Sequence, residues 1–320
     1  MKKRYSIGVD IGGTNTDIGL VDRQGNCIAK NSLKTSQYYD PQIFVNDLVA
    51  KIHTLLKQFD VLQLTGIGVG APCANYYDGS IDYASNLNFK GRVFIREMIQ
   101  KQLNFPVVIT NDANAAAYGE MIYGGAKGMK HFIMITLGTG MGSGIVIDGK
   151  ILHGYNGFAG ELGHCVIIPE GRSCACGNKG CIERYVSHHG ITQTCMELLH
   201  QNPSNELAQR SAGILNCKTI AEAANAGNPV AIETFNRTGY WLGIALANAV
   251  NFSAPEAIFL MGGPVRSGEI LLKPLRESFE KHRLFLYNYP LPILVSSLKE
   301  NDAAILGAAA LTKVNDGNFS

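Results

Sequence analysis

The sequence has little of what marks membrane, secreted or nucleic-acid-binding proteins. Its net charge is only +2 over 320 residues, and without a dense run of lysine and arginine a nucleic-acid partner has no electrostatic support. No apolar stretch is long enough to cross a membrane, and the one after residues 1–4 is broken at Asp10, Gly12 and Gly13, which argues against a signal peptide. We therefore expect a cytoplasmic protein that binds neither membrane nor nucleic acid and keeps its cysteines reduced.

What the sequence does contain is a globular α/β pattern. Apolar residues make up 46% of the chain and charged residues 17%, a balance typical of folded proteins, and 320 residues suit one large or two medium domains. The apolar periodicity predicts strands at 5–9, 18–21, 27–33, 64–70, 107–110, 131–137, 145–147, 257–261 and 293–295. It predicts helices at 42–58, 93–103, 113–120, 185–200, 219–226, 229–251 and 302–312. Two strand–turn–strand units, one early and one central, indicate a duplicated architecture of two α/β domains.

Both of these units turn through glycines, at residues 10–16 and 138–144. Neither turn is a P-loop, because the Gly-Lys-Ser/Thr ending is absent, and neither matches a dinucleotide fingerprint, because the second leads into a strand. Because glycine has no side chain, the backbone N–H groups of such a turn can approach an anion closely, and threonine hydroxyls add further hydrogen-bond donors. The alternative is a pair of ordinary hairpin turns. Two such turns together favour the phosphates of a nucleotide as the ligand. The first turn begins with an acid, Asp10, that can hold Mg²⁺ through water. The predicted nucleotide-binding residues are Asp10, Gly12, Gly13, Thr14, Gly138, Thr139 and Gly140.

A third glycine turn, at Gly262 and Gly263, follows the predicted strand at 257–261. Glycines at the carboxyl end of a strand let a planar ring or a ribose lie against the backbone. An ordinary strand-to-helix turn is the alternative.

Asn111 and Asp112 come directly after the predicted strand at 107–110. Ligands of two-lobed α/β proteins bind at the carboxyl ends of strands. A kinase that acts on an alcohol needs one carboxylate to orient the hydroxyl and accept its proton. We therefore predict that Asp112 is the catalytic base and that Asn111 holds a neighbouring sugar hydroxyl. The alternative for Asp112 is a cap of the following helix.

A cluster of cysteines indicates a metal site. Three cysteines fall within eight positions, and in a reducing compartment such clustering points to metal binding rather than to disulfides. The glycine turn at 177–180 can fold their sulfur atoms around one point, and a nearby histidine completes a closed tetrahedral set. The sequence therefore predicts structural Zn²⁺ on His164, Cys174, Cys176 and Cys181, with buried or redox cysteines as the alternative. Such a closed set excludes a zinc hydrolase, which needs an open position.

Two carboxylates flank these metal ligands, Glu161 on one side and Glu183 on the other. Carboxylates that accept from vicinal hydroxyls are a common way to hold a sugar. If His164 binds zinc through one ring nitrogen, its other N–H can donate to a sugar oxygen. We therefore predict that Glu161, Glu183 and His164 contact the sugar.

Residues 160–183 carry Gly-Glu-Leu-Gly-His followed by Cys-x-Cys-Gly-x-x-Gly-Cys-x-Glu, which resembles the signature of the ROK family (repressors, open reading frames and kinases). The likeness runs from Asp10 to the Gly307-Ala-Ala-Ala-Leu segment near the end. It implies a two-lobed actin-like ATPase (ribonuclease H-like) fold with a cleft between the lobes. The lobes would comprise residues 1–115 plus 302–320, and residues 116–301 with the zinc site. The resemblance also implies ATP and Mg²⁺ as cofactors and a homodimer.

The same resemblance carries over roles for individual residues. It places phosphate on the first two glycine turns and adenosine near Gly262 and Gly263. It adds Asn86 to the sugar-binding residues Asn111, Asp112, Glu161, His164 and Glu183. The activity it implies is that of a glucokinase-like enzyme of glycolysis, which transfers the γ-phosphoryl group of ATP to the 6-hydroxyl of glucose. Kinases for N-acetylglucosamine, N-acetylmannosamine, fructose and allose share the signature and are alternatives.

One segment departs from the family pattern. Family kinases often carry a Pro-Asn-Leu-Pro-Gly-Trp type segment before the base, whereas residues 84–92 read Ala-Ser-Asn-Leu-Asn-Phe-Lys-Gly-Arg. Asn86 is kept, but the proline after Leu87 and the Gly-Trp pair are absent, which affects the path of the loop and the sugar preference.

The family also includes repressors, which carry a helix-turn-helix domain before the first glycine turn. Only nine residues precede Asp10, and they are predicted to form a strand, so we expect no such domain. The alternative from another class is a non-catalytic, sugar-sensing regulator without a DNA-binding domain.

Overall fold

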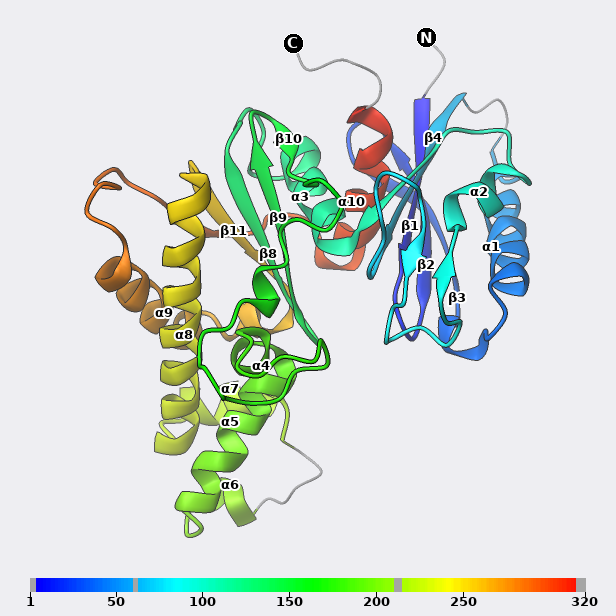
Figure 1. The fold of residues 1–320 in the computed structure, drawn as a ribbon. Coiled ribbons are helices and arrows are strands. Elements are labelled where there is room, and N and C mark those ends of the chain that lie inside the picture. Colours follow the sequence, from blue (N-terminus) through cyan, green and yellow to red (C-terminus); the bar gives the residue numbers. More distant parts are fainter. Residues whose placement is uncertain (1–3, 60–62, 210–214, 315–320) are drawn as a thin grey trace. The chain divides into compact units, whose positions relative to one another are not determined.

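The computed structural model describes residues 4–59, 63–209 and 215–314, and the chain divides into two compact units (Figure 1). Unit 1 comprises Met1–Lys130, Gly144–Gly160 and Ser296–Ser320, and unit 2 comprises His131–Ser143 and Glu161–Val295. The predicted lobes, 1–115 with 302–320 and 116–301, stay a prediction. Residues 1–3 and 315–320 of the first predicted lobe lie outside the described part.

Unit 1 is built on a mixed sheet with the strand order β3-β2-β1-β4-β7. Its strands are β1 (Arg4–Ile11), β2 (Thr16–Asp22), β3 (Cys27–Leu33), β4 (Gln63–Ala71) and β7 (Val107–Asn111). β2 runs antiparallel to β1, and β4 and β7 run parallel to it. Because Asp10 pairs with Gly70 and Gly70 pairs with Thr110, the carboxyl ends of β1, β4 and β7 meet at one edge of the sheet.

Helices pack against this sheet according to the alternation of its side chains. Ile7 and Val9 point into a core that they share with Phe44 of α1, whereas Gly8, on the opposite face, lies against α10. Asp40 starts α1 by accepting hydrogen bonds from the first free N–H groups. The helices are α1 (Pro41–Leu56), α2 (Ile95–Gln100), α3 (Asp112–Tyr123) and α10 (Glu300–Val314). Shorter elements are η1 (Thr35–Gln37), β5 (Ile81–Asp82) and β6 (Arg92–Val93).

The second sheet repeats the plan of the first, with the order β10-β9-β8-β11-β12. Its strands are β8 (Phe132–Leu137), β9 (Met141–Ile147), β10 (Lys150–Ile151), β11 (Ala257–Met261) and β12 (Ile293–Val295). β8, β11 and β12 are parallel, and the glycine turn joins β8 to β9, as the turn after β1 joins it to β2. The predicted duplication is thus confirmed at the level of strand order.

The helices of unit 2 form two apolar clusters. Leu242 and Leu246 of α8 and Leu275 of α9 pack with the buried side chains of β8 and β11, and a second cluster joins α5, α7 and the start of α8. The helices are α4 (Glu183–Val186), α5 (His188–Gln201), α6 (Glu206–Gln209), α7 (Cys217–Asn225), α8 (Pro229–Ser253) and α9 (Glu269–His282). Turns of 3₁₀ type are η2 (Leu162–His164) and η3 (Gly263–Ser267). Within the described residues, none of the helices has both the length and the apolar character needed to cross a bilayer.

Two predictions of secondary structure were wrong. The helix predicted at 185–200 is divided into α4 and α5, because Ser187 is extended and its side chain caps the N-terminus of α5 by accepting from Gly190. The predicted glycine turn at 138–144 is shorter, since β9 already begins at Met141. Gly144 belongs to the strand, where a Cβ atom would lie 2.8 Å from the Ala113 carbonyl oxygen, so glycine here serves close packing on α3.

Candidate active site

In unit 1, two carboxylates lie at the carboxyl edge of the parallel strands. Asp10 is near the end of β1, and Asp112 follows β7 as the first residue of α3. Gly70 of β4 separates them: a Cβ atom built on it would lie 3.9 Å from Asp10 Oδ1 and 3.7 Å from the Asp112 Cα. Both are ordinary van der Waals distances, whereas the Ala115 Cβ atom would lie only 3.2 Å away, so Gly70 serves the close packing of β4 on α3 beside the two carboxylates. Sequence reasoning did not select it. A glycine inside a strand was the available signal.

The environment of these carboxylates favours their protonated forms. Burial, with the nearby charges of Asp112 and Asp17 as smaller causes, raises the pKa of Asp10 to about 7. Asp112 is exposed, but surrounding protein atoms still desolvate its carboxyl group and raise its pKa, against two backbone hydrogen bonds that lower it. A carboxylate whose pKa is raised is a stronger base, which suits proton acceptance near neutral pH.

The helix that follows is capped mainly by Asn111. Its side-chain oxygen accepts from Ala113 N at 2.8 Å, and the Asp112 carboxylate also approaches that N–H, at 2.8 Å. The helix therefore does not require Asp112 as its N-terminal cap, which was the alternative role for this residue. The Asn111 amide N–H₂ group can still donate to a sugar hydroxyl, as predicted.

The first glycine turn is close to the loop that carries Asn86. Gly12 N donates to Asn15 O at 2.9 Å and closes the turn. A Cβ atom on Gly13 would lie only 2.6 Å from the Asn86 carbonyl oxygen, so glycine is needed here for close approach. The Asn86 side chain is exposed. Unit 1 thus brings the predicted phosphate turn, Asn86 and the two carboxylates together.

In unit 2, the second and third glycine turns adjoin each other. β8 and β11 are parallel neighbours, with Met261 paired to Thr136, so both turns follow the same edge. Gly262 has φ +114°, and a Cβ atom there would lie 1.9 Å from the Leu137 carbonyl oxygen. Gly138 and Gly263, in contrast, have no atom within 4 Å of such a Cβ. Their backbones can be approached by a ligand, as phosphate and adenosine contacts require.

The four predicted metal ligands converge in unit 2. One ligand atom from each of His164, Cys174, Cys176 and Cys181 lies within 4.8 Å of all the others. Cys174 Sγ is 3.6 Å from His164 Nδ1, and Cys176 Sγ is 3.6 Å from Cys181 Sγ. A zinc ion with bonds of about 2.0–2.3 Å separates tetrahedral ligands by roughly 3.3–3.8 Å. The set therefore fits Zn²⁺. Burial and the two neighbouring thiols raise the pKa of Cys181 to about 12, a cost that a bound cation would offset.

The predicted sugar-binding groups adjoin this cluster. His164 turns Nδ1 toward Cys174 and leaves Nε2 4.0 Å from Glu161 Oε2. Glu183 Oε2 accepts from Met141 N at 3.0 Å, directly after the second glycine turn, and its other oxygen is 4.0 Å from Cys174 Sγ. Glu183 therefore lies between the metal ligands and the phosphate turn. The contribution of Met141 N was not predicted, because a backbone donor leaves no signal in sequence.

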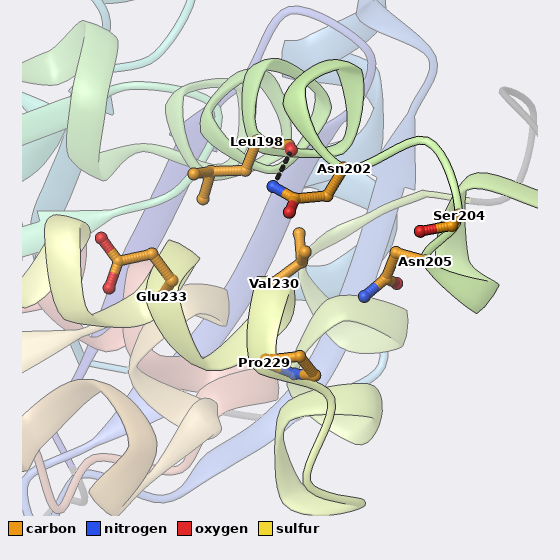
Figure 2. A pocket seen from close by; sticks show the side chains of 7 residues that line it. All are labelled: Leu198, Asn202, Ser204, Asn205, Pro229, Val230 and Glu233. Atoms are coloured by element: carbon orange, nitrogen blue, oxygen red, sulfur yellow. Dashed lines mark hydrogen bonds between the residues drawn. The ribbon is translucent and has the colours of Figure 1, made fainter.

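A separate pocket of about 340 Å³ lies elsewhere in unit 2 (Figure 2). It is lined by residues from the end of α5, the segment before α6 and the start of α8: Leu198, Asn202, Ser204, Asn205, Pro229, Val230 and Glu233. Asn202 is held there by a 2.9 Å bond from its amide to the Leu198 carbonyl. No predicted site residue lines this pocket.

The chain is similar to known proteins over nearly its whole length. The family model described as "ROK family" matches residues 6–315. The glucokinase of Halalkalibacterium halodurans is 34% identical over 325 residues, which cover 100% of this chain and 98% of that protein. The crystal structure of a ROK family glucokinase from Streptomyces griseus in complex with glucose and AMPPNP matches with a TM-score of 0.81 and 31% identity, over 97% of this chain and 99% of that one. The xylose repressor of Bacillus subtilis is 30% identical over 306 residues, 95% of this chain and 76% of the repressor.

Together with the paired sheets, these matches define the class of protein: the chain has the two-lobed, actin-like ATPase fold, as predicted. It belongs to the ROK family.

Proposed function

We propose that this protein is an ATP-dependent sugar kinase of the hexokinase type that phosphorylates the 6-hydroxyl of glucose. The observation that carries the proposal is Asp112, a carboxylate of raised pKa at the carboxyl edge of β7 with Asn111 and Asn86 in the same unit. Relatives named glucokinase match over nearly the whole chain, and one of them was solved with glucose and an ATP analogue.

In the proposed reaction, Asp112 accepts the proton of the sugar hydroxyl as its oxygen attacks the γ-phosphorus. The O–H bond of the sugar and the bond from the γ-phosphorus to the leaving oxygen of ADP break, and a new O–P bond forms. Asp112 then carries the proton, and ADP leaves with the electron pair of the broken bond. Asn111 and Asn86 orient the sugar, so that the attacking oxygen faces the phosphorus.

Groups of unit 2 also have proposed roles. Glu161, Glu183 and the outer nitrogen of His164 hold sugar hydroxyls, and the turn Gly138–Gly140 receives phosphate on N–H groups other than that of Gly138, which donates to Gly140 O at 2.9 Å. Zn²⁺ held by His164 and the three cysteines would order the segment that carries these groups. Mg²⁺ held through water by Asp10 would neutralise phosphate charge. The homodimer and the cytoplasmic location stay predictions.

The xylose repressor match favours a second candidate, a sugar-sensing regulator without catalysis. The two functions separate at Asp112, because a sensor needs sugar affinity but no base. The kinase proposal accounts for the carboxylate of raised pKa, which sugar binding alone does not require.

A coupled ADP-release assay with Mg-ATP tests the proposal. Glucose, N-acetylglucosamine, N-acetylmannosamine, mannose, fructose and allose are compared with a no-sugar background. We expect glucose to give the highest turnover, and preference for another hexose would correct the substrate while keeping the reaction. No turnover on any sugar, with sugar binding still visible by thermal shift, would favour the regulator.

A further inference from the structure

The loop at 84–91, which departs from the family pattern, is held by anchors of its own. Tyr83 N donates to Gly91 O at 2.9 Å and closes the base of the loop. Leu87 and Phe89 are buried, with 1% and 3% of their surfaces exposed, and the Phe89 ring lies 5.4 Å from that of Phe44 on α1. Asn86 and Ser85 are exposed between these anchors. The loop therefore has a fixed path without the proline that relatives carry.

Asn88 follows Leu87, where the family pattern given above has a proline, and makes a contact that proline cannot make. Its Nδ2 atom donates to the Ser36 carbonyl oxygen at 2.6 Å. A carbonyl oxygen only accepts, so the amide nitrogen must face it. Ser36 N in turn donates to the Thr14 carbonyl oxygen at 3.2 Å, at the end of the first glycine turn.

A second contact joins the same two segments. The Asn86 carbonyl oxygen is so near Gly13 that a Cβ atom there would approach it to 2.6 Å. The sugar loop thus touches the phosphate turn directly at Gly13 and, through Asn88 and Ser36, at Thr14. The two hydrogen bonds, Asn88 to Ser36 and Ser36 to Thr14, and the close approach at Gly13 give a route by which a displacement of one segment can reach the other.

We propose that Asn88 is a positioning residue that couples sugar binding at Asn86 to nucleotide binding at the turn of residues 10–14. Phosphate on the turn fixes Thr14, Thr14 fixes Ser36, and Ser36 holds Asn88 and the loop in the conformation that receives sugar. By reciprocity, bound sugar then strengthens nucleotide binding by the same factor. The inference rests on the proposed kinase function and names a residue that couples the binding of its two substrates.

The test compares Asn88→Asp, which keeps the shape but replaces the donor by an acceptor, with Ser85→Ala in the same loop as control. The sugar Kd is measured by calorimetry with and without a non-hydrolysable ATP analogue and Mg²⁺, using the hexose that the assay panel selects. In the wild type and in Ser85→Ala, the analogue should tighten sugar binding. In Asn88→Asp we expect this factor to fall about fivefold to tenfold, the effect of one lost hydrogen bond. The Kd of the analogue alone should stay within about twofold.

Asn88→Ala removes the donor without adding charge and should reproduce the loss if Asn88→Asp is poorly folded. A merely structural role would weaken sugar binding equally with and without the analogue, so an unchanged coupling factor in both variants would overturn the inference. If the wild type turns over a hexose and both variants keep full coupling, the inference about Asn88 is wrong and the proposed kinase function stands. Absence of turnover in the wild type on every hexose would instead overturn the function and, with it, this inference.

Discussion

The two units hold their functional groups in different ways. In unit 1, Asp10 and Asp112 are placed by the register of three parallel strands and by a glycine between them. In unit 2, Glu161 and Glu183 flank a loop with little regular structure, whose convergent groups are one histidine and three thiols. Pairing between regular strands orders the first set. In the second, turn bonds and isolated bridges such as that between Val166 and Cys181 order the segment, and a metal ion on the four ligands would cross-link it further.

This difference teaches where each part is vulnerable. Changes to unit 1 should affect the chemical step or the charge balance and leave the fold of the sheet intact. Changes to the metal ligands of unit 2 should loosen the segment that carries sugar-binding groups.

The largest expected effect is on the chemical step. Asp112→Asn keeps the size of the side chain and the bond to Ala113 but removes the base, so kcat should fall by about 10²–10⁴-fold. The glucose Kd should change much less, since the amide oxygen still accepts hydrogen bonds. Rapid-quench kinetics and calorimetry measure the two quantities.

Glu97→Gln, a neutralisation of an exposed carboxylate on α2, is the matched control and should keep nearly full kcat. Turnover of Asp112→Asn near that of the wild type would remove Asp112 from the role of base.

Removal of the metal should give the next largest effect and should be confined to unit 2. Metal analysis should find about one zinc per chain, and Cys176→Ser should lose it, since three ligands hold zinc far less tightly than four. Hydrogen exchange should then speed up in residues 161–183 and stay unchanged in β1 and β4. Sugar affinity should weaken by roughly tenfold or more.

Cys165→Ser is the control, because Cys165 neighbours His164 but is not among the convergent ligands. A metal-free protein with full activity and unchanged exchange would contradict the comparison of the two units.

The sequence predicted the parts of the site that depend on chemical type and spacing. The ligand set around Cys174–Cys181 and the position of Asp112 after a strand are of this kind: the four ligand atoms converge within unit 2, and Asp112 follows β7 in unit 1. The repeated hairpin pattern predicted a duplicated architecture, and the two sheets do share one plan.

What depends on packing could not be predicted. Helix α9 was missed because Pro274 interrupts its pattern, although Leu271, Leu275 and Phe279 bury enough apolar surface to stabilise it. The bond from Asn88 to Ser36 joins residues 52 positions apart, and only the fold brings them together.

A smaller effect should separate the two glycines of the second phosphate turn. Gly140→Ala would place a Cβ atom 2.4 Å from Glu183 Oε2 and so displace this carboxylate from Met141 N. We expect the glucose Kd, measured without nucleotide, to rise about fivefold, the effect of one misplaced hydrogen-bonding group. Gly138→Ala is the matched control, since nothing lies within 4 Å of its Cβ atom. Equal glucose affinity in both variants would show that Glu183 does not depend on this turn.

A last expected effect, of similar size, concerns stability and pH rather than activity. Because the pKa of Asp10 is about 7 in the folded protein and near 3.8 when unfolded, the folded state binds the proton more tightly between these values. The free energy of unfolding should therefore fall as pH rises from about 4 to 7, through loss of that proton. Asn cannot ionise, so Asp10→Asn should be more stable than the wild type at pH 8 and should differ little from it at pH 4. We expect about 1–2 kcal/mol at pH 8, less than the full pKa difference would give, because Asp10 is partly exposed. Urea unfolding without nucleotide and Mg²⁺ measures this.

In Asp112→Asn, carboxyl NMR should show a lower pKa for Asp10, since the charge of Asp112 contributes to raising it. If the stability difference is the same at pH 4 and pH 8, the pKa of Asp10 is the same in the folded and unfolded protein. The two carboxylates of unit 1 would then behave like ordinary solvated carboxylates.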